Sequence, residues 1–179
     1  MNLNASIIDQ RLSGVQDEIR AWAREELGVT DAGRLKPLAF AYLCVKTMLD
    51  LDAQEAFDCV TDGGGDFGVD AMQVKEEVNG EFLVTLFQAK YKTQLDANSN
   101  FEERGIQALI HAIRHIFDPT AELGAINERL RVKVEEARGM LRDGHIPRVR
   151  AIACNNGLKW NAQAQQLIEL ELLGEQVTW

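Results

Sequence analysis

The segment from Asp62 to Asp70 and the pair Gln88 and Lys90 are the parts of this chain best suited to chemistry. The first is a glycine-rich turn, Asp62-Gly-Gly-Gly-Asp66-Phe-Gly-Val-Asp70, and the second closes an apolar stretch. A carboxylate and an amide oxygen can hold a hard divalent cation, and a lysine adds positive charge beside a phosphate. Together they could activate water and neutralise a phosphodiester, so they favour phosphodiester hydrolysis.

We assign each of these side chains a role in that chemistry. Asp70 is the metal carboxylate, Gln88 is a weaker second ligand through its side-chain carbonyl, and Lys90 is the cation for the developing charge. Glycines let the backbone turn sharply and come close to a substrate. The residues expected nearest the substrate are Gly64, Gly65, Gly68, Tyr91 and Lys92.

The elements that must position the site follow from apolar periodicity and turn residues. Pro37 is expected in the first turn of its helix, and Asp52 is expected to cap the next helix, with Glu55 at its third position. Helices are expected over residues 7–27, 36–49, 53–57, 101–117, 124–141 and 161–173, and strands over 69–75, 82–91 and 149–154.

The first two strands should form a hairpin, and side-chain parity determines how they pair. Opposite residues of an antiparallel pair project to the same face, so joining the two apolar faces pairs even-numbered residues with even-numbered ones. This pairing brings Asp70 to the face of Gln88 and Lys90. A two-residue turn at Asn79-Gly80 would give the wrong parity, so we expect a three-residue loop or a bulge.

Length and composition indicate one α/β domain over residues 1–179, with a helical part, 1–60, before an αβ core, 61–179. The abrupt end suggests a piece of a longer protein. A net charge of −9 argues against a surface that coats nucleic acid, although a local site can still be basic. Cys44, Cys59 and Cys154 are widely spaced and predict buried free thiols. No signal peptide or bilayer-length apolar run is visible, so we expect a cytoplasmic protein without a membrane partner.

Three further patterns do not indicate sites of other kinds: the histidine pair is expected to have a structural or solvent-facing role, and a calcium loop is discounted. His111 and His115 are four residues apart, but no glutamate lies between them as in metalloproteases. The acids of the glycine-rich turn are also four apart, whereas a calcium loop of the EF-hand kind needs alternating ligands. The alternating charges over residues 128–142 are expected to form a solvated helix face.

Three segments carry a family resemblance: residues 38–42 (LAFAY), 61–71 (TDGGGDFGVDA) and 86–91 (LFQAKY). They resemble the N-terminal domain of abortive-infection phage-resistance (AIPR) proteins and, more broadly, the Mrr-type branch of the PD-(D/E)xK nuclease superfamily. The resemblance covers roughly residues 36–116. It implies a three-layer α/β/α, restriction-endonuclease-like core with a short mixed sheet, here after an N-terminal helical extension. It also implies Mg²⁺ or Mn²⁺ dependence and DNA cleavage in prokaryotic phage defence.

Residue by residue, Asp70, Gln88 and Lys90 match the superfamily's metal-binding Asp, its D/E position and its catalytic Lys. Gln88 departs from the strict pattern because an amide carries no negative charge for Mg²⁺, although Mrr-like members use Gln there with another acid compensating. Asp66 is our first choice for that acid because it is near Asp70, and Asp62 is expected mainly to form the turn. Helix acids that could compensate instead are Glu55, Glu25 and Glu26.

We therefore expect a metal-dependent endonuclease whose partner is nucleic acid, DNA first, with a homodimer left open. The alternative is a catalytically silent nuclease-like fold that binds nucleic acid or a protein. Gln88 and the acidic composition favour this alternative, which needs no metal. A further alternative is an oligomerisation module with a structural glycine turn, in which Asp70 would matter more for stability than for activity.

Overall fold

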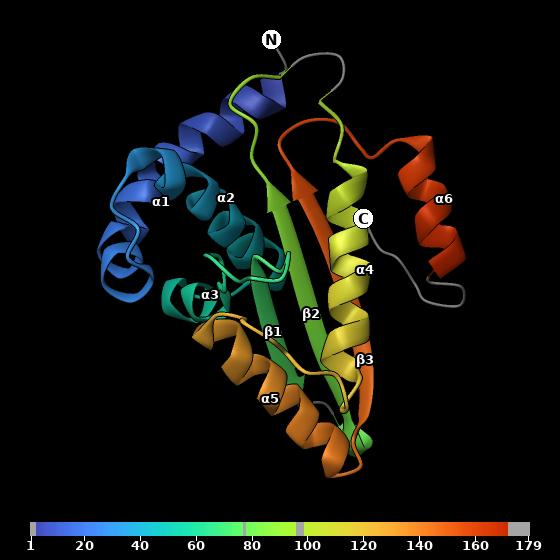
Figure 1. The fold of residues 1–179 in the computed structure, drawn as a ribbon. Coiled ribbons are helices and arrows are strands. Elements are labelled where there is room, and N and C mark those ends of the chain that lie inside the picture. Colours follow the sequence, from blue (N-terminus) through green and yellow to red (C-terminus); the bar gives the residue numbers. More distant parts are fainter. Residues whose placement is uncertain (1–2, 77, 96–98, 172–179) are drawn as a thin grey trace.

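The computed structural model describes residues 3–76, 78–95 and 99–171, and Figure 1 shows its elements in chain order. The helices of this part of the chain are α1 (Leu3–Leu27), α2 (Ala32–Leu49), α3 (Ala53–Cys59), α4 (Glu103–Phe117), α5 (Glu128–Arg142) and α6 (Ala162–Glu171). The strands are β1 (Ala71–Glu76), β2 (Glu81–Lys90) and β3 (Ile146–Asn155). The expected α/β class is confirmed.

The sheet is mixed, with β2 in the centre. β1 pairs with β2 antiparallel, and β3 pairs with β2 parallel after a crossover that contains α4 and α5. Met72 lies opposite Leu86 and Val74 opposite Val84, so the even-to-even pairing predicted for the hairpin is confirmed. This pairing puts Asp70, just before β1, at the same end of the sheet as Gln88 of β2.

The hairpin connection is longer than the three-residue loop predicted from its parity. The last paired residues are Glu76 and Phe82, and Val78–Gly80 form a 3₁₀ turn between the strands. Both Asn79 and Gly80 have positive φ, a conformation that Gly and Asn adopt more readily than other residues. The Asn-Gly pair therefore makes the reversal, while the added residues keep the parity that the apolar faces require.

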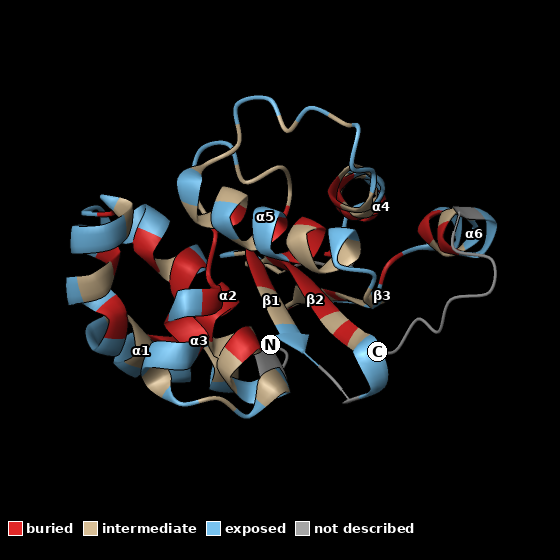
Figure 2. Ribbon diagram, turned by 90° about the horizontal axis from the view of Figure 1, so that it is seen from below, coloured by how far each residue is buried: buried red, intermediate tan, exposed pale blue. Residues whose placement is uncertain are grey.

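Helices cover both faces of the sheet and give three layers (Figures 1 and 2). On one face, α1, α2 and α3 pack against Ala71 and Phe87. On the other face, α4 and α5 pack against Met72 and Leu86. All four strand residues are fully buried, as expected for a short sheet with helices on both sides. A smaller cluster around Trp160 joins α6 to α4.

Helix α2 begins four residues earlier than predicted. The Asp31 side chain accepts a hydrogen bond of 2.8 Å from the Arg34 backbone N–H and caps the helix at Ala32. The stabilisation from the capping Asp31 exceeds the cost of the low helix propensity of Gly33. The helix therefore starts earlier, and Pro37 lies inside it and not in its first turn. The capping box predicted for Asp52 and Glu55 is confirmed at the start of α3.

Helix α5 does not have the fully solvated charged face that its sequence suggests. Arg138 is only 6% exposed, and its guanidinium donates to the carbonyl oxygens of His115, Ile116, Asp118 and Ala121, where α4 ends. Arg129 similarly donates to carbonyl oxygens of Phe57 and Val60. The charge pattern alone predicts that both arginines face solvent, because it gives no sign of their backbone carbonyl partners.

Cys44, Cys59 and Cys154 are free thiols, as predicted, but only Cys59 is buried; the other two are half-buried. Within the described ranges, no helix combines the length and apolar character that a bilayer crossing requires.

Candidate metal centre

The loop from Thr61 to Asp70 turns back on itself, with its ends tied together. The Thr61 backbone N–H donates to the carbonyl oxygen of Asp70 at 2.9 Å, and the Thr61 hydroxyl donates to that of Val69 at 2.7 Å. Backbone turns with positive φ occur within the loop at Gly63, Gly65, Phe67 and Gly68. These turns bring residues that are four apart in sequence to the same place.

Three carboxylates meet inside this loop. Asp62, Asp66 and Asp70 each offer an oxygen, and the three oxygens lie within 4.8 Å of one another. Mg²⁺ holds oxygen ligands at about 2.1 Å, which places neighbouring ligands about 3 Å apart, so small side-chain movements would let the cluster fit a divalent cation. Asp66 thus lies where the compensating acid was expected, and Asp62, expected mainly to form the turn, joins it.

Asp70 is held by backbone groups of the central strand. Its Oδ2 accepts a hydrogen bond of 2.6 Å from the N–H of Ala89, and its own N–H donates to the Phe87 carbonyl oxygen at 2.9 Å. Burial raises the pKa of Asp70 to about 6, against the opposing effects of Lys90 and the Ala89 N–H. A bound cation would stabilise the ionised form of this carboxylate, which is buried and repelled by the charges of Asp62 and Asp66.

Lys90 supplies positive charge to two members of the cluster. Burial and the charge of Asp66 raise the pKa of Asp62, while the charges of Lys90 and Arg34 act to lower it. Lys90 also acts to lower the pKa of Asp70. Among the described residues its ammonium group forms no ion pair, and it interacts with the charges of Asp62 and Asp70.

Gln88 is buried between two glycines. A Cβ at Gly68 would lie 3.3 Å from its Nε2, and one at Gly105 of α4 would lie 2.6 Å from its Oε1. That oxygen has no hydrogen-bond partner within the described residues, and an unsatisfied buried acceptor is costly. Because Oε1 faces Gly105, the role of Gln88 as second metal ligand stays a prediction.

The helix acids that could have compensated for Gln88 lie elsewhere. Glu55 completes the capping box of α3, Glu26 pairs with Arg129 at 2.6 Å, and Glu25 lies on the exposed surface of α1. None of them belongs to the acidic group found within the described residues. These acids serve as a helix cap, an ion-pair partner or a surface residue, whereas the acids of the loop lie close together.

The glycines expected near a substrate have different environments. An added Cβ at Gly64 would meet nothing within 4 Å, so this exposed residue is open. At Gly65 it would lie 2.7 Å from the Ala125 carbonyl oxygen, and the Gly65 carbonyl itself accepts from the Asn127 N–H. Gly65 and Gly68 therefore let the loop pack on the protein, and Gly64 is the one of these three that leaves open space.

Tyr91 and Lys92 are used by the fold at the end of β2. The Tyr91 hydroxyl donates to the carboxylate of Asp9 on α1, and its ring packs against α2. The Lys92 ammonium donates to the Asn100 carbonyl oxygen at 3.0 Å. These contacts explain both side chains without a substrate, so their expected proximity to one stays a prediction.

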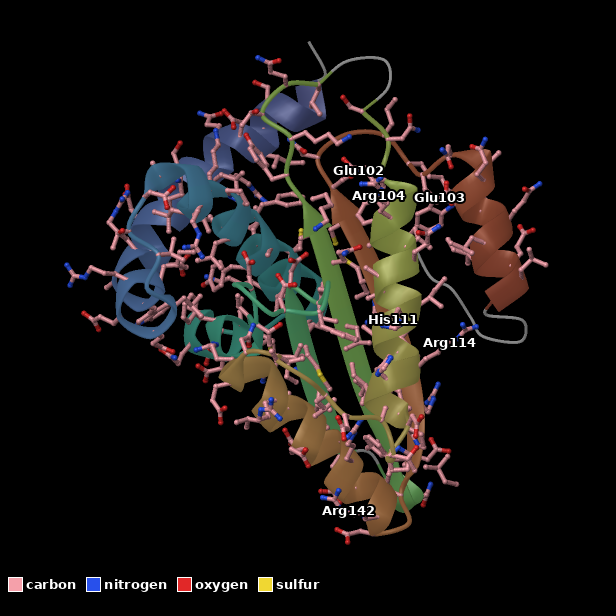
Figure 3. All side chains as sticks on the ribbon, in the orientation of Figure 1. Glu102, Glu103, Arg104, His111, Arg114 and Arg142 are labelled. Atoms are coloured by element: carbon pink, nitrogen blue, oxygen red, sulfur yellow. The ribbon has the colours of Figure 1, made fainter. Side chains whose placement is uncertain are left out.

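Phe67 joins the loop to helix α4. Its ring stacks on His111 with centroids 5.0 Å apart and meets His115 edge-on at 5.3 Å. Figure 3 shows His111 on α4. This packing agrees with the structural role expected for the histidine pair, since the two imidazoles anchor the turn that carries Asp66.

Asp62 is the member of the acidic cluster whose role is underestimated from the sequence, and the charge of the exposed Arg34 acts on it from α2. The four-residue spacing of the three aspartates is the sequence signal for this cluster, although it does not match the alternating ligands of an EF-hand loop. Arg34 lies in the first turn of α2, far from the loop in sequence, and no local pattern points to it.

The chain was compared with known protein families, curated proteins and solved structures. No protein family, no curated protein and no solved structure matches the chain.

Proposed function

We propose that this chain is a metal-dependent nuclease domain that hydrolyses phosphodiester bonds, with DNA as substrate and Mg²⁺ or Mn²⁺ as cofactor. The observation that carries this proposal is the convergence of Asp62, Asp66 and Asp70, with Lys90 acting on the cluster. Oxygen ligands of this kind suit hard cations, and a cation beside a carboxylate cluster suits a phosphate substrate.

The residues divide the chemistry between them. A divalent cation held by the three aspartates would neutralise charge on the phosphate and make water more nucleophilic. Asp70 is kept in place by the Ala89 N–H, so this ligand is held against the central strand. Lys90 places a positive charge where the phosphate oxygens gain negative charge during the reaction. Gly64 leaves space for a substrate strand to approach the loop.

Two finer expectations belong to the same proposal. The helices on both faces of a mixed sheet support a restriction-endonuclease-like core. The resemblance of the glycine-rich turn and of residues 86–91 to AIPR proteins supports a role in prokaryotic phage defence. Neither expectation is needed for the cleavage reaction itself, which depends on the acidic cluster and Lys90.

The test is cleavage of supercoiled plasmid and single-stranded DNA by the full chain, with Mg²⁺ or Mn²⁺ and with EDTA. Wild type should cut only with metal, and folded Asp70→Asn and Lys90→Met variants should lose about 100-fold or more of the rate. Asp58→Asn is the matched control, because Asp58 is an exposed acid of α3 whose side chain accepts from Gln54. Cutting that survives EDTA, or that Asp70→Asn leaves unchanged, contradicts the proposal.

A second candidate is a catalytically silent domain that binds nucleic acid or a protein. The observation that favours it is Gln88, whose Oε1 faces α4 and supplies no charge to the site. Metal binding distinguishes the two. A wild-type protein that neither cuts DNA nor melts at a higher temperature with Mn²⁺ would support the silent domain and overturn the nuclease.

A further inference from the structure

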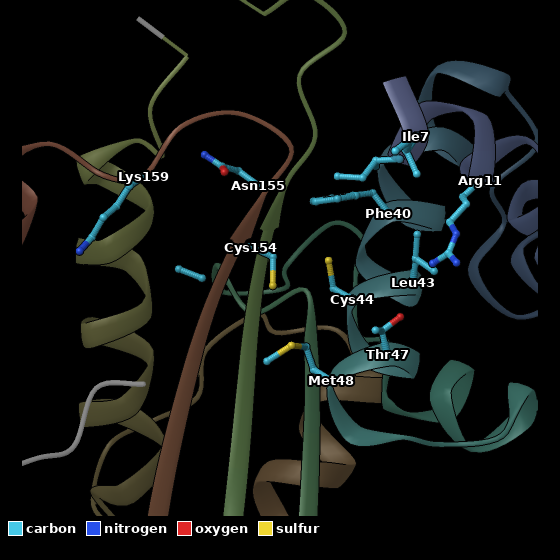
Figure 4. Close-up of a pocket in the computed structure, with 12 residues that line it drawn as sticks. Ile7, Arg11, Phe40, Leu43, Cys44, Thr47, Met48, Cys154, Asn155 and Lys159 are labelled. Atoms are coloured by element: carbon cyan, nitrogen blue, oxygen red, sulfur yellow. The ribbon is translucent and has the colours of Figure 1, made fainter. Parts of the chain in front are cut away.

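Cys44 and Cys154 bring two thiols together from distant parts of the chain. Cys44 lies on α2 and Cys154 on β3, and Figure 4 shows both side chains reaching into the space between helix and sheet. Each thiol affects the other, because their proximity raises the pKa of Cys44 and lowers the pKa of Cys154. Neither is in a disulfide.

Both thiols line an open cavity of about 630 Å³ (Figure 4). Ile7 and Met48 also line it and are 47% and 41% exposed, so the cavity communicates with solvent. A small polar oxidant such as hydrogen peroxide is far smaller than this space. Cys59 is different, because it is buried on α3 and does not line the cavity.

We propose that Cys44 and Cys154 form an oxidisable dithiol, a modification site at which hydrogen peroxide produces a disulfide between α2 and β3. Paired, solvent-accessible thiols are the arrangement in which a first oxidised sulfur is resolved by a second. Two thiols alone make an incomplete zinc site, since structural zinc takes four ligands. The described residues place no further His, Cys, Asp or Glu with them in a ligand group.

The chemistry balances in two steps. The Cys154 sulfur attacks one peroxide oxygen, the O–O bond breaks, and Cys154 becomes a sulfenic acid while the other oxygen leaves as water. The Cys44 sulfur then attacks the Cys154 sulfur, the S–S bond forms, the S–O bond breaks, and a second water leaves with the Cys44 proton. Two electrons pass from the sulfurs to peroxide, and a thiol reductant reverses the change.

The disulfide would act close to the candidate metal centre. Cys154 is the ladder partner of Ala89, and the Ala89 N–H is the group that holds Asp70. Closing the S–S bond to about 2.0 Å draws α2 toward this end of β3. Oxidation should therefore change metal binding at Asp70, a consequence that rests on the proposed function, whereas disulfide formation itself does not.

The experiment treats the reduced full chain with a small molar excess of hydrogen peroxide, stops with catalase, and blocks free thiols with N-ethylmaleimide in denaturant. Intact mass should show two thiols lost per monomer, with a decrease of two hydrogen masses before blocking. Tryptic digestion should give residues 35–46 joined to residues 151–159, and dithiothreitol should separate them. The peptide of residues 47–75 should carry N-ethylmaleimide on Cys59, because that thiol is expected to remain reduced.

Other products would overturn the proposal. These are oxygen added to Cys154 without a cross-link, a cross-link through Cys59, a disulfide-linked dimer, or three intact thiols at a peroxide dose that fully oxidises free cysteine. Cys44→Ser tests the order of steps, because Cys154 without its partner should gain oxygen and form no cross-link. The wild-type peptide map decides the matter even if that variant fails to fold. Mn²⁺-induced stabilisation, measured separately, tests the link to Asp70.

Discussion

The backbone N–H of Ala89 lies 2.6 Å from the Asp70 carboxylate, and this contact makes the glycine-rich loop and the central strand one unit. The strand fixes the acid through a backbone group, so the identity of residue 89 has little influence on the contact. Asp70 is 6% exposed, and its carboxylate shares its surroundings with two other aspartates. Function and stability oppose each other at this point, because the group that would bind a cation destabilises the metal-free fold.

Asp70→Asn should therefore stabilise the metal-free protein at alkaline pH. The folded pKa, about 6, is above the ordinary value of 3.8, so the wild type loses stability as pH rises through this range. Full ionisation costs up to about 3 kcal/mol, and the variant escapes this loss while its side-chain oxygen can still accept from Ala89. Thermal melts in EDTA should show the variant's advantage at pH 8 and little of it at pH 4. An equal advantage at both values would refute the titration.

Bound Mn²⁺ should make the wild type more stable than Asp70→Asn at pH 8, which reverses the order found without metal. Mn²⁺ should raise the melting temperature of wild type at pH 8, and the rise should shrink below about pH 6 as protons compete for Asp70. Asp62→Asn should weaken Mn²⁺ binding about 10-fold or more, because it removes one charged ligand from the cluster. Calorimetric titration measures the affinity, with Asp58→Asn as control. Unchanged affinity in Asp62→Asn would remove that residue from the site.

Gly105→Ala should destabilise the protein by about 1–3 kcal/mol. Its added Cβ would lie 2.6 Å from both Gln88 Oε1 and a ring carbon of Phe101. Gly139→Ala on α5 is the matched helical control, since its nearest neighbour would be 3.8 Å away, and it should stabilise by about 0.5–1 kcal/mol. Urea unfolding measures both. Equal effects of the two substitutions would show that Gln88 is not confined as described.

Arg138→Met should destabilise by about 2–4 kcal/mol, because it leaves the carbonyl groups at the end of α4 without their donor. Arg142→Met, at the exposed end of the same helix, should change stability by less than about 0.5 kcal/mol. Hydrogen exchange should also show faster opening of the last turn of α4 in Arg138→Met alone. Similar unfolding curves for the two variants would contradict a bridging role for Arg138.

Much of the architecture could be predicted from sequence because its determinants are local. Apolar periodicity indicates the helices and strands, and parity predicts that even-numbered residues of the hairpin pair with even-numbered ones, as Met72 and Leu86 do. Asp62 was undervalued because positive φ values at Gly63 and Phe67, which decide where the loop turns, cannot be read from residue spacing. Arg138 was misassigned for a related reason: its partners are carbonyl groups exposed only when α4 ends beside α5.

The order of pairing around β2 also has a kinetic consequence. β1 reaches β2 through a short hairpin, whereas β3 pairs with it only after the crossover that contains α4 and α5. During synthesis, one side of an apolar strand therefore has unpaired backbone groups until residue 155 emerges. Such edges invite association with other chains, and non-local pairing is slow. Folding yield should therefore depend most on how quickly the crossover that contains α4 and α5 brings β3 to the unpaired side of β2.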